Sequence, residues 1–303
     1  MSLKYSIFKT FHKYLKYGSI FEKEDENLIY DFLINNRTSS DGKGSKIPKN
    51  LNIKTDIIDG CKVLKLIPKK LTNNNIVVYL HSGGHAAEML FIHWYFIRKL
   101  SKKTGSIIYI PIYPLTPEHD CRATIKFLEH FYRKIQDKYD NICLLGESSG
   151  ASLTLSLSMM IRDLGLKEPK NITLISPCSI LNVKDEENKE IYKEMQEISK
   201  QEVIISINAF PTLMNLWKGP YDNKHYWVSP YYGDFHNLKN ITLITGTNQD
   251  IMYPINKRLY KKMIENHVEN FTYIERDLCH DFIVFCSKES KDIFNQIVNN
   301  ITK

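Results

Sequence analysis

The chain has 303 residues, of which 41 are Lys or Arg and 34 are Asp or Glu, so its formal net charge is +7. The basic residues are spread along the chain and form no dense block, which argues against nucleic-acid binding. No apolar run reaches the roughly 18 residues of a membrane-spanning helix. The length is enough to bury a large core, in one large α/β domain or in two domains.

The six cysteines show no Cys-x-x-Cys spacing, and several fall in expected strands, where a free cysteine behaves as a small apolar residue. The apolar stretch of a secretory signal does not follow Met1. We therefore expect a cytoplasmic protein with reduced cysteines.

The first 50 residues are expected to be helical and then loose. Apolar side chains share one face of the first helix, and lysines lie mostly on the other: Ile7, Phe8, Phe11, Tyr14 and Leu15 against Lys4, Lys9, Lys13 and Lys16. We interpret this helix as a cap on the body of the same chain, with contact to a membrane surface as the alternative. Residues 38–45 have the composition of a turn-rich linker.

From residue 61 onward, short apolar runs alternate with helical stretches, a pattern typical of a mostly parallel sheet covered on both faces. The expected strands are 63–67, 76–80, 107–112, 142–145, 172–175, 241–244 and 271–274, and the expected helices are 86–103, 121–138, 150–164, 254–267 and 287–302. The interval 180–238 is too long for a simple loop. We predict an α/β domain over 51–303 with a helical insertion at about 180–238, which forms a lid together with residues 1–50.

The pattern Gly-x-Ser-x-Gly occurs at residues 146–150, between the apolar run 142–145 and a helical stretch. A strand, a sharp turn and a helix at this pattern form a nucleophile elbow, which exposes a serine hydroxyl at the end of a sheet. Gly146 and Gly150 allow the close backbone approach that such a turn needs. The pattern predicts Ser148 as a nucleophile, with the N–H of Ser149 directed at the same spot.

A nucleophilic serine needs a base and an orienting acid, and both should follow strands of an open α/β sheet. His280 follows the last expected strand by a short loop, so we predict it as the base. Asp250 is the only carboxylate in the loop after strand 241–244, so we predict it as the acid, with Asp277 as the second choice. The chain order of serine, acid and histidine matches a catalytic triad.

The stretch His81-Ser82-Gly83-Gly84-His85 directly follows strand 76–80. Gly83 and Gly84 can present backbone N–H groups with no side chain in the way. Together with the N–H of Ser149 they predict an oxyanion hole, in which one donor is typically worth about 100- to 1000-fold in rate.

These motifs resemble the hormone-sensitive-lipase branch of the α/β-hydrolases. The resemblance spans about residues 61–302 and rests on five stretches in family order: His81-Ser-Gly-Gly84, Tyr113-Pro-Leu-Thr-Pro-Glu-His119, Gly146-Glu-Ser-Ser-Gly150, Ile175-Ser-Pro177 and Val228-Ser-Pro230. It implies the three-layer α/β-hydrolase fold, a carboxylesterase-type activity, and a cap built from the N-terminus and the insertion.

The chain departs from the family pattern in four places. Ser82 replaces a glycine of the oxyanion motif, Ser149 replaces an alanine, Glu147 replaces an aspartate, and the acid loop reads Asp250-Ile-Met where the family has Asp-Pro-Leu. None of these changes removes a catalytic group, so they bear on substrate preference.

The sequence therefore predicts a metal-independent serine carboxylesterase that needs no cofactor and acts on small to medium acyl or acetyl esters through an acyl-enzyme. An amidase or deacetylase would use the same groups, and a non-catalytic small-ligand receptor could share the fold. The expected partner is a small-molecule ester, with no nucleic acid. Membrane contact through the N-terminal helix is a minor alternative, and a homodimer is left open.

Overall fold

A computed structural model of the protein describes residues 26–35 and 47–303. The amphipathic helix expected near the N-terminus and the linker at 38–45 lie outside the described residues, so both stay predictions. Among the helices described, none is long and apolar enough to cross a lipid bilayer.

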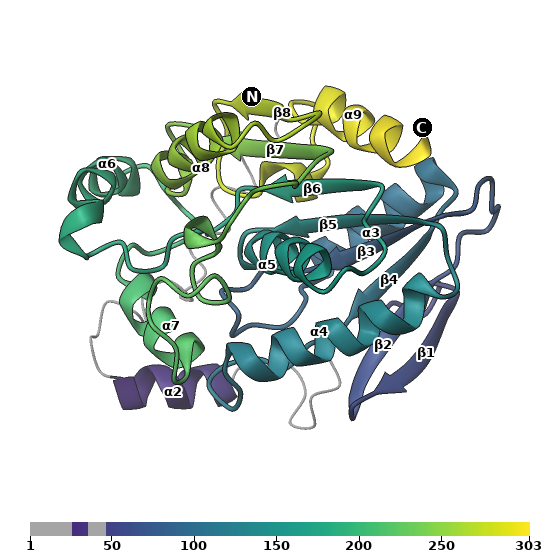
Figure 1. Ribbon diagram of the computed structural model, residues 1–303, viewed down its shortest axis with the longest axis horizontal. Helices are drawn as coiled ribbons and strands as arrows, with labels where there is room; N and C mark the ends of the chain where they lie inside the picture. The colour runs from purple at the N-terminus through teal and green to yellow at the C-terminus, as the bar shows by residue number, and fades with distance from the viewer. Residues whose placement is uncertain (1–25, 36–46) are drawn as a thin grey trace.

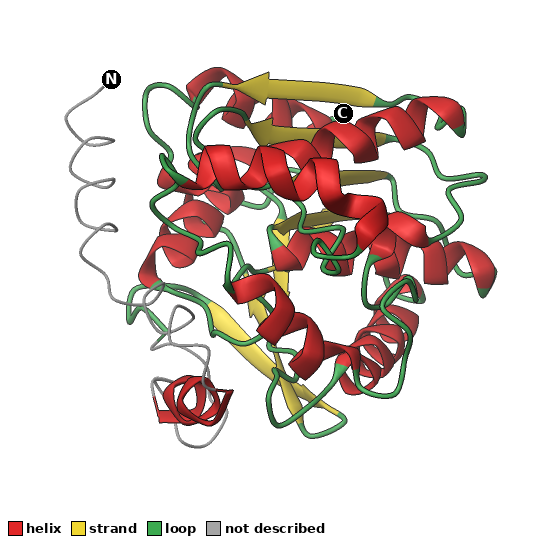
Figure 2. Ribbon diagram, turned by 90° about the vertical axis from the view of Figure 1, so that its left-hand side faces the viewer, coloured by secondary structure: helices red, strands yellow, loops and turns green. Residues whose placement is uncertain are grey.

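A twisted sheet with strand order β1-β2-β4-β3-β5-β6-β7-β8 forms the centre of the fold (Figures 1 and 2). The first two strands and β4 pair antiparallel, and all pairs from β4 to β8 are parallel. The strands are β1 (Ile53–Ile58), β2 (Cys61–Leu66), β3 (Asn75–Leu80), β4 (Ile107–Pro111), β5 (Asn141–Glu147), β6 (Asn171–Ile175), β7 (Ile241–Gly246) and β8 (Thr272–Arg276).

Both faces of the sheet are buried under helices, which explains why its central strands are apolar throughout. In β3, Ile76, Val78 and Leu80 pack into one core, whereas Val77 and Tyr79 pack into the core on the opposite face. The first face is covered by α4 (Cys121–Gln136), α5 (Ser149–Asp163) and α8 (Tyr253–Glu265), and the second by α3 (Phe91–Thr104) and α9 (Lys291–Thr302). The α/β fold class expected from the sequence is confirmed.

The sequence missed one strand and placed the start of one helix five residues too early. Strand β1 was missed because its residues 54–57 are exposed at the sheet edge, so the strand lacks the apolar run of its neighbours. The helix expected from residue 86 begins at Phe91 instead, because the N–H groups of Ala86 and Ala87 bond to the carbonyl of Gly83 in a tight loop.

The interval 180–238 holds two α-helices, α6 (Lys189–Ser199) and α7 (Ala209–Lys218), and the short 3-10 helices η2 (Glu186–Asn188) and η3 (Pro230–Tyr232). Helix α6 packs on α8, and α7 lies beside α2 (Glu26–Asn35), as Figure 1 shows. Ile29 and Leu33 of α2 form a small apolar cluster with Ala209 of α7 and Ala86, which belongs to the loop after β3. This cluster joins α2 and α7 to the loop in which the oxyanion motif lies.

Candidate active site

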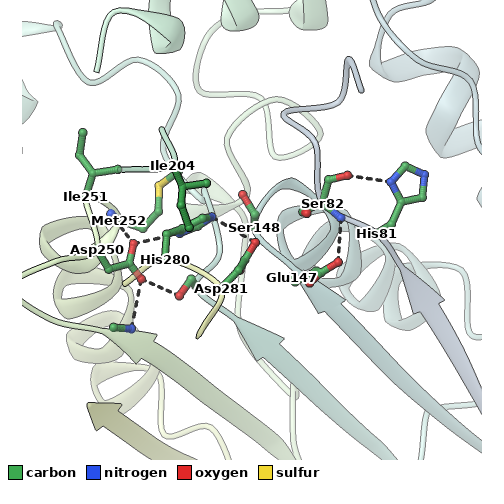
Figure 3. Close-up of polar contacts among 12 residues, drawn as sticks. His81, Ser82, Glu147, Ser148, Ile204, Asp250, Ile251, Met252, His280 and Asp281 are labelled. Carbon is green, nitrogen blue, oxygen red and sulfur yellow. Dashed lines mark hydrogen bonds and ion pairs between the residues drawn. The ribbon is translucent and has the colours of Figure 1, made fainter. Parts of the chain in front are cut away.

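The loops after β3, β5, β7 and β8 meet at the carboxyl-terminal edge of the sheet, where Figure 3 shows their side chains. The parallel register aligns the strand ends, since Leu80 pairs with Gly146 and Glu147 pairs with Ile175. Residues far apart in sequence are brought together here, as expected for an open α/β sheet.

Ser148 forms the turn between β5 and α5 and has a backbone conformation of φ 49° and ψ −121°. Such a conformation is uncommon outside glycine and costs energy that the surrounding structure must supply. The turn is held by a hydrogen bond from Ser148 N to Ile175 O at 2.8 Å. A Cβ on Gly150 would lie 2.1 Å from Leu80 O, and one on Gly146 would lie 2.3 Å from Gly150 O. The two glycines are therefore required by the close packing of the elbow.

Asp250 and His280 form a buried pair, with Asp250 Oδ1 2.9 Å from His280 Nδ1. The carboxylate of Asp250 also accepts the Ser176 hydroxyl at 2.6 Å and the N–H groups of Gly246 and Met252 at 3.1 and 2.9 Å. These bonds fix the orientation of the carboxylate and therefore that of the histidine ring.

The second-choice acid, Asp277, lies at the exposed surface and accepts a hydrogen bond from Thr247 Oγ1 at 3.3 Å. The structure thus joins His280 to Asp250. In Figure 3 the ring of His280 lies between Asp250 on one side and Ser148 and Asp281 on the other.

Asp281 was not singled out in the sequence, although it follows His280 directly. Its Oδ2 lies 3.2 Å from His280 Nε2, the nitrogen that faces away from Asp250. Burial would lower the pKa of His280, but the charges of Asp281 and Asp250 outweigh it and raise that pKa well above its ordinary value. Burial raises the pKa of Asp281 to about 6, although the neighbouring His280 opposes this shift.

The predicted oxyanion loop follows β3. Gly83 and Gly84 have φ values of 128° and 61°, which favour glycine. Within the described chain, neither N–H takes part in a hydrogen bond, whereas the Gly83 carbonyl accepts bonds from Ala86 and Ala87. Both N–H groups are thus available to a ligand.

Glu147 is fully buried behind this loop. Its Oε1 accepts hydrogen bonds from the Tyr79 hydroxyl and, at 3.2 Å, from Ser82 N, and lies 3.3 Å from His93 Nε2. Burial raises the pKa of Glu147 to about 7, against the lowering effect of the Tyr79 hydrogen bond. His93 comes from α3 and carried no signal in the sequence, because its partners are set by tertiary packing.

His81 opens the loop and is also buried. Its ring stacks on Tyr113 with centroids 4.5 Å apart, and the Tyr113 hydroxyl donates to His81 O at 2.6 Å. Burial lowers the pKa of His81 to about 3, so its ring is neutral. The His81 motif and the Tyr113 motif noted in the sequence thus meet here.

Helix α7 lies directly against the oxyanion loop. The ring of Trp217 stacks on His85 with centroids 3.9 Å apart, and a Cβ on Gly84 would lie 2.9 Å from Leu213 Cδ1. The same interval also contacts the loop of Asp250, because the carboxylate of Glu202 accepts a hydrogen bond from Ile251 N at 3.0 Å. The N–H groups of Val203 and Ile204, at 2.8 Å, hold this carboxylate in place. The interval 180–238 therefore touches both the oxyanion loop and the loop of Asp250.

Comparison with known proteins identifies the family of this chain. Residues 77–284 match the family described as the α/β-hydrolase fold, so the chain belongs to that family. It is 24% identical to a Mycobacterium tuberculosis protein that carries the name acetyl-hydrolase LipR, over 71% of this chain and 68% of that protein. It is also 24% identical to the hormone-sensitive lipase of Bos taurus, over 39% of this chain and 17% of the lipase. The predicted resemblance to the hormone-sensitive-lipase-like branch is confirmed.

The fold is shared with solved structures as well. A crystal structure of an esterase/lipase from an uncultured bacterium superposes with a TM-score of 0.79 at 16% identity, covering 99% of this chain and 98% of the other. At that identity the likeness shows the fold alone.

Proposed function

We propose that the protein is a serine carboxylesterase that hydrolyses small to medium acyl or acetyl esters through an acyl-enzyme. The single observation that carries the proposal is the buried pair of Asp250 and His280, joined at 2.9 Å beside the elbow serine Ser148. Such a base, oriented by an acid, is what a weak hydroxyl nucleophile needs.

In the first half of the reaction, Ser148 Oγ attacks the ester carbonyl carbon while its proton passes to His280 Nε2. Asp250 holds the proton on Nδ1, which leaves Nε2 as the accepting nitrogen. The tetrahedral intermediate then collapses, the proton moves from Nε2 to the alcohol oxygen, and the alcohol leaves. In the second half, water loses a proton to Nε2 and attacks the acyl-enzyme, which releases the acid and restores Ser148.

The negative charge that develops on the carbonyl oxygen would be held by the N–H groups of Gly83, Gly84 and Ser149. The first two form no other hydrogen bond in the described chain, and the third sits at the N-terminus of α5, where the helix dipole also favours an anion. Rigid donors of this kind stabilise the transition state more than the substrate.

The esterase, lipase and acetyl-hydrolase names of the relatives support ester hydrolysis. The reaction as derived invokes no metal or cofactor. Amide or small-molecule deacetylase activity would use the same groups and is a second outcome of the test below.

The test is the release of p-nitrophenol from acetyl, butyryl, octanoyl and palmitoyl esters by the native chain and by Ser148→Ala. Since the hydroxyl is the nucleophile, we expect kcat to fall by at least about 10⁴-fold in this variant. A matched control is Ser158→Ala on the same helix, whose hydroxyl donates only to Thr154 O at 2.7 Å, and it should keep the native rate.

Equal rates for the native chain and Ser148→Ala would overturn the proposal. Labelling of the native chain, but not of Ser148→Ala, by a fluorophosphonate together with no turnover of any ester would identify a reactive serine with a different acyl substrate. Folding of each variant is checked by circular dichroism.

A further inference from the structure

The imidazole of His280 is flanked by two carboxylates, one at each ring nitrogen. Asp250 Oδ1 lies 2.9 Å from Nδ1, and Asp281 Oδ2 lies 3.2 Å from Nε2. A serine triad requires only the first of these carboxylates. The second contacts the nitrogen that has to receive the proton of Ser148.

Asp281 combines an unfavourable backbone conformation with a buried carboxylate. Its backbone is left-handed, with φ 51° and ψ 28°, a conformation that glycine adopts without strain and aspartate tolerates at a cost. It is 6% exposed, and its Oδ1 has no hydrogen-bond partner among the described residues. A buried carboxylate with one unpartnered oxygen is unfavourable for folding alone, which suggests a role in the reaction.

Charged groups face this pair from several elements. Besides Asp250, the buried Glu147 lies at the end of β5, Glu202 enters from the 180–238 interval, and His93 faces Asp281 from α3. Burial lowers the pKa of His93 to about 4 and raises those of Glu147 and Glu202 to about 7. Near neutral pH, His93 is therefore neutral, and among the described residues the basic side chain paired with Asp281 is His280, whose pKa is raised by the charges of Asp281 and Asp250.

We propose that Asp281 is a further catalytic residue: in the free enzyme its carboxylate holds Nε2 of His280 as an ion pair, and the ester can react only after that nitrogen has lost its proton and can accept the one from Ser148. This inference rests on the proposed hydrolase function and adds a carboxylate to its mechanism.

The proton balance follows directly. In the resting ion pair, Nδ1 carries a proton shared with Asp250, and Nε2 carries a second proton, with Asp281 Oδ2 3.2 Å away at ion-pair distance but not in hydrogen-bond geometry. The second proton passes to solvent before catalysis, and the neutral ring then accepts one from Ser148 Oγ. Once the imidazolium has formed again during the reaction, Asp281 stabilises it until the proton goes to the leaving alcohol.

The contact between Asp281 and His280 should determine the pH below which kcat/KM falls, which is the acid limb of the pH–rate profile. Because an adjacent carboxylate favours the protonated imidazole, the free enzyme should need a higher pH to become active than a triad without Asp281. Removing the carboxylate should move the acid limb of kcat/KM to lower pH by about one unit or more.

Two variants suit the left-handed backbone and are expected to fold: Asp281→Asn keeps the shape of the side chain, and Asp281→Gly removes it. The matched control is Asp59→Asn. Asp59 also has a left-handed backbone, with φ 49°, and lies 2.5 Å from His130 Nδ1, but this pair is at the surface. Asp59→Asn should leave the profile of kcat/KM against pH unchanged.

The expected result is the same downward shift of the acid limb in both Asp281 variants. An unchanged limb in both, with only kcat or KM altered, would mean that Asp281 is merely structural and would overturn the inference. A shift of the limb to higher pH would overturn it as well.

A second readout does not depend on turnover. The ring of His280 is titrated by NMR in Ser148→Ala, with its resonance assigned by its loss in His280→Gln, and the titration is repeated with Asp281→Asn added. A fall in the titration midpoint supports the inference even if no ester is hydrolysed, and an unchanged midpoint contradicts it. Failure of the proposed function alone would appear as missing turnover with the midpoint still shifted.

Discussion

The hydroxyl of Ser149 illustrates how a single buried atom can be unfavourable. The residue is 1% exposed, and its Oγ has no hydrogen-bond partner among the described residues. A hydroxyl that loses its water on folding and gains no partner costs free energy. The backbone N–H of the same residue, which the proposed mechanism uses, does not depend on the side chain.

We therefore predict that Ser149→Ala raises the free energy of unfolding by roughly 0.5 to 2 kcal/mol, since it removes the unpartnered hydroxyl and introduces a better helix former. Urea unfolding measures the change. Ser156→Ala is the contrast on the same helix, because the Ser156 hydroxyl donates to Tyr226 O at 2.8 Å, and it should lower the stability. A loss of stability in Ser149→Ala would show that its hydroxyl has a partner after all.

At the residue scale, the sequence predicted where candidate reactive groups lie but not which side chains surround them. Ser148, Asp250 and His280 could be selected because each follows a strand of a parallel sheet, and the carboxyl ends of such strands meet. The roles assigned to them stay predictions. His93 and Glu202 come close to these groups through tertiary packing, which a single sequence does not reveal, and the contact of Asp281 with Nε2 depends on its local left-handed backbone.

At the scale of elements, the elbow between β5 and α5 depends on a backbone approach so close that it leaves no room for a side chain at Gly150. A Cβ on Gly150 would lie 2.1 Å from Leu80 O and 2.4 Å from His81 O, and both are backbone atoms that cannot rotate away. Close approach of α5 to the end of β3 therefore requires glycine at this position.

Gly150→Ala should destabilise the protein by about 3 kcal/mol or more, because either α5 or the end of β3 has to move. Thermal or urea unfolding measures this. Gly165→Ala is the control: a Cβ there meets nothing within 4 Å, and its φ of +58° alone should cost about 1 kcal/mol. Equal losses in the two variants would mean that the elbow relaxes easily.

Apolar runs located seven of the strands in the described chain, and in β3, β5, β6 and β7 these runs reflect burial on both faces. The exception was β1, an edge strand whose residues Lys54, Thr55 and Asp56 face solvent. Helix ends were less accurate where a loop has its own structure, as before α3. Whether 180–238 and the N-terminal segment form one cap domain stays a prediction.

For the whole molecule, buried ionisable groups predict an optimum of stability. The pKa of Glu147 is raised to about 7. Its contribution to the free energy of unfolding is therefore complete below the pKa that this carboxyl has in the unfolded chain, and it is lost as the pH rises toward 7. Burial lowers the pKa values of three histidines to about 3, 3 and 4: His81, His85 and His93. Their contribution to the free energy of unfolding is therefore complete above about pH 6.5 and is lost as the pH falls. These opposite trends place the optimum near pH 6.

We predict that Glu147→Gln abolishes the loss of stability that Glu147 causes as the pH rises toward 7. Relative to the native chain, the variant should gain up to about 3 kcal/mol between pH 5 and pH 8, because glutamine does not ionise and keeps an acceptor for Tyr79 and Ser82. Urea unfolding at a series of pH values measures the difference. A difference that does not vary with pH would contradict burial of an ionising carboxyl at this position.

Under the proposed function, the contact between α7 and the predicted oxyanion loop would make the rate of reaction depend on the size of the ester. Leu213 approaches Gly84, and Trp217 stacks on His85, so an ester bulky enough to push α7 outward would disturb the loop that has to hold the developing charge. Such an ester could still bind, yet it would turn over slowly. Selectivity built in this way acts on the rate of the bound complex more than on its affinity.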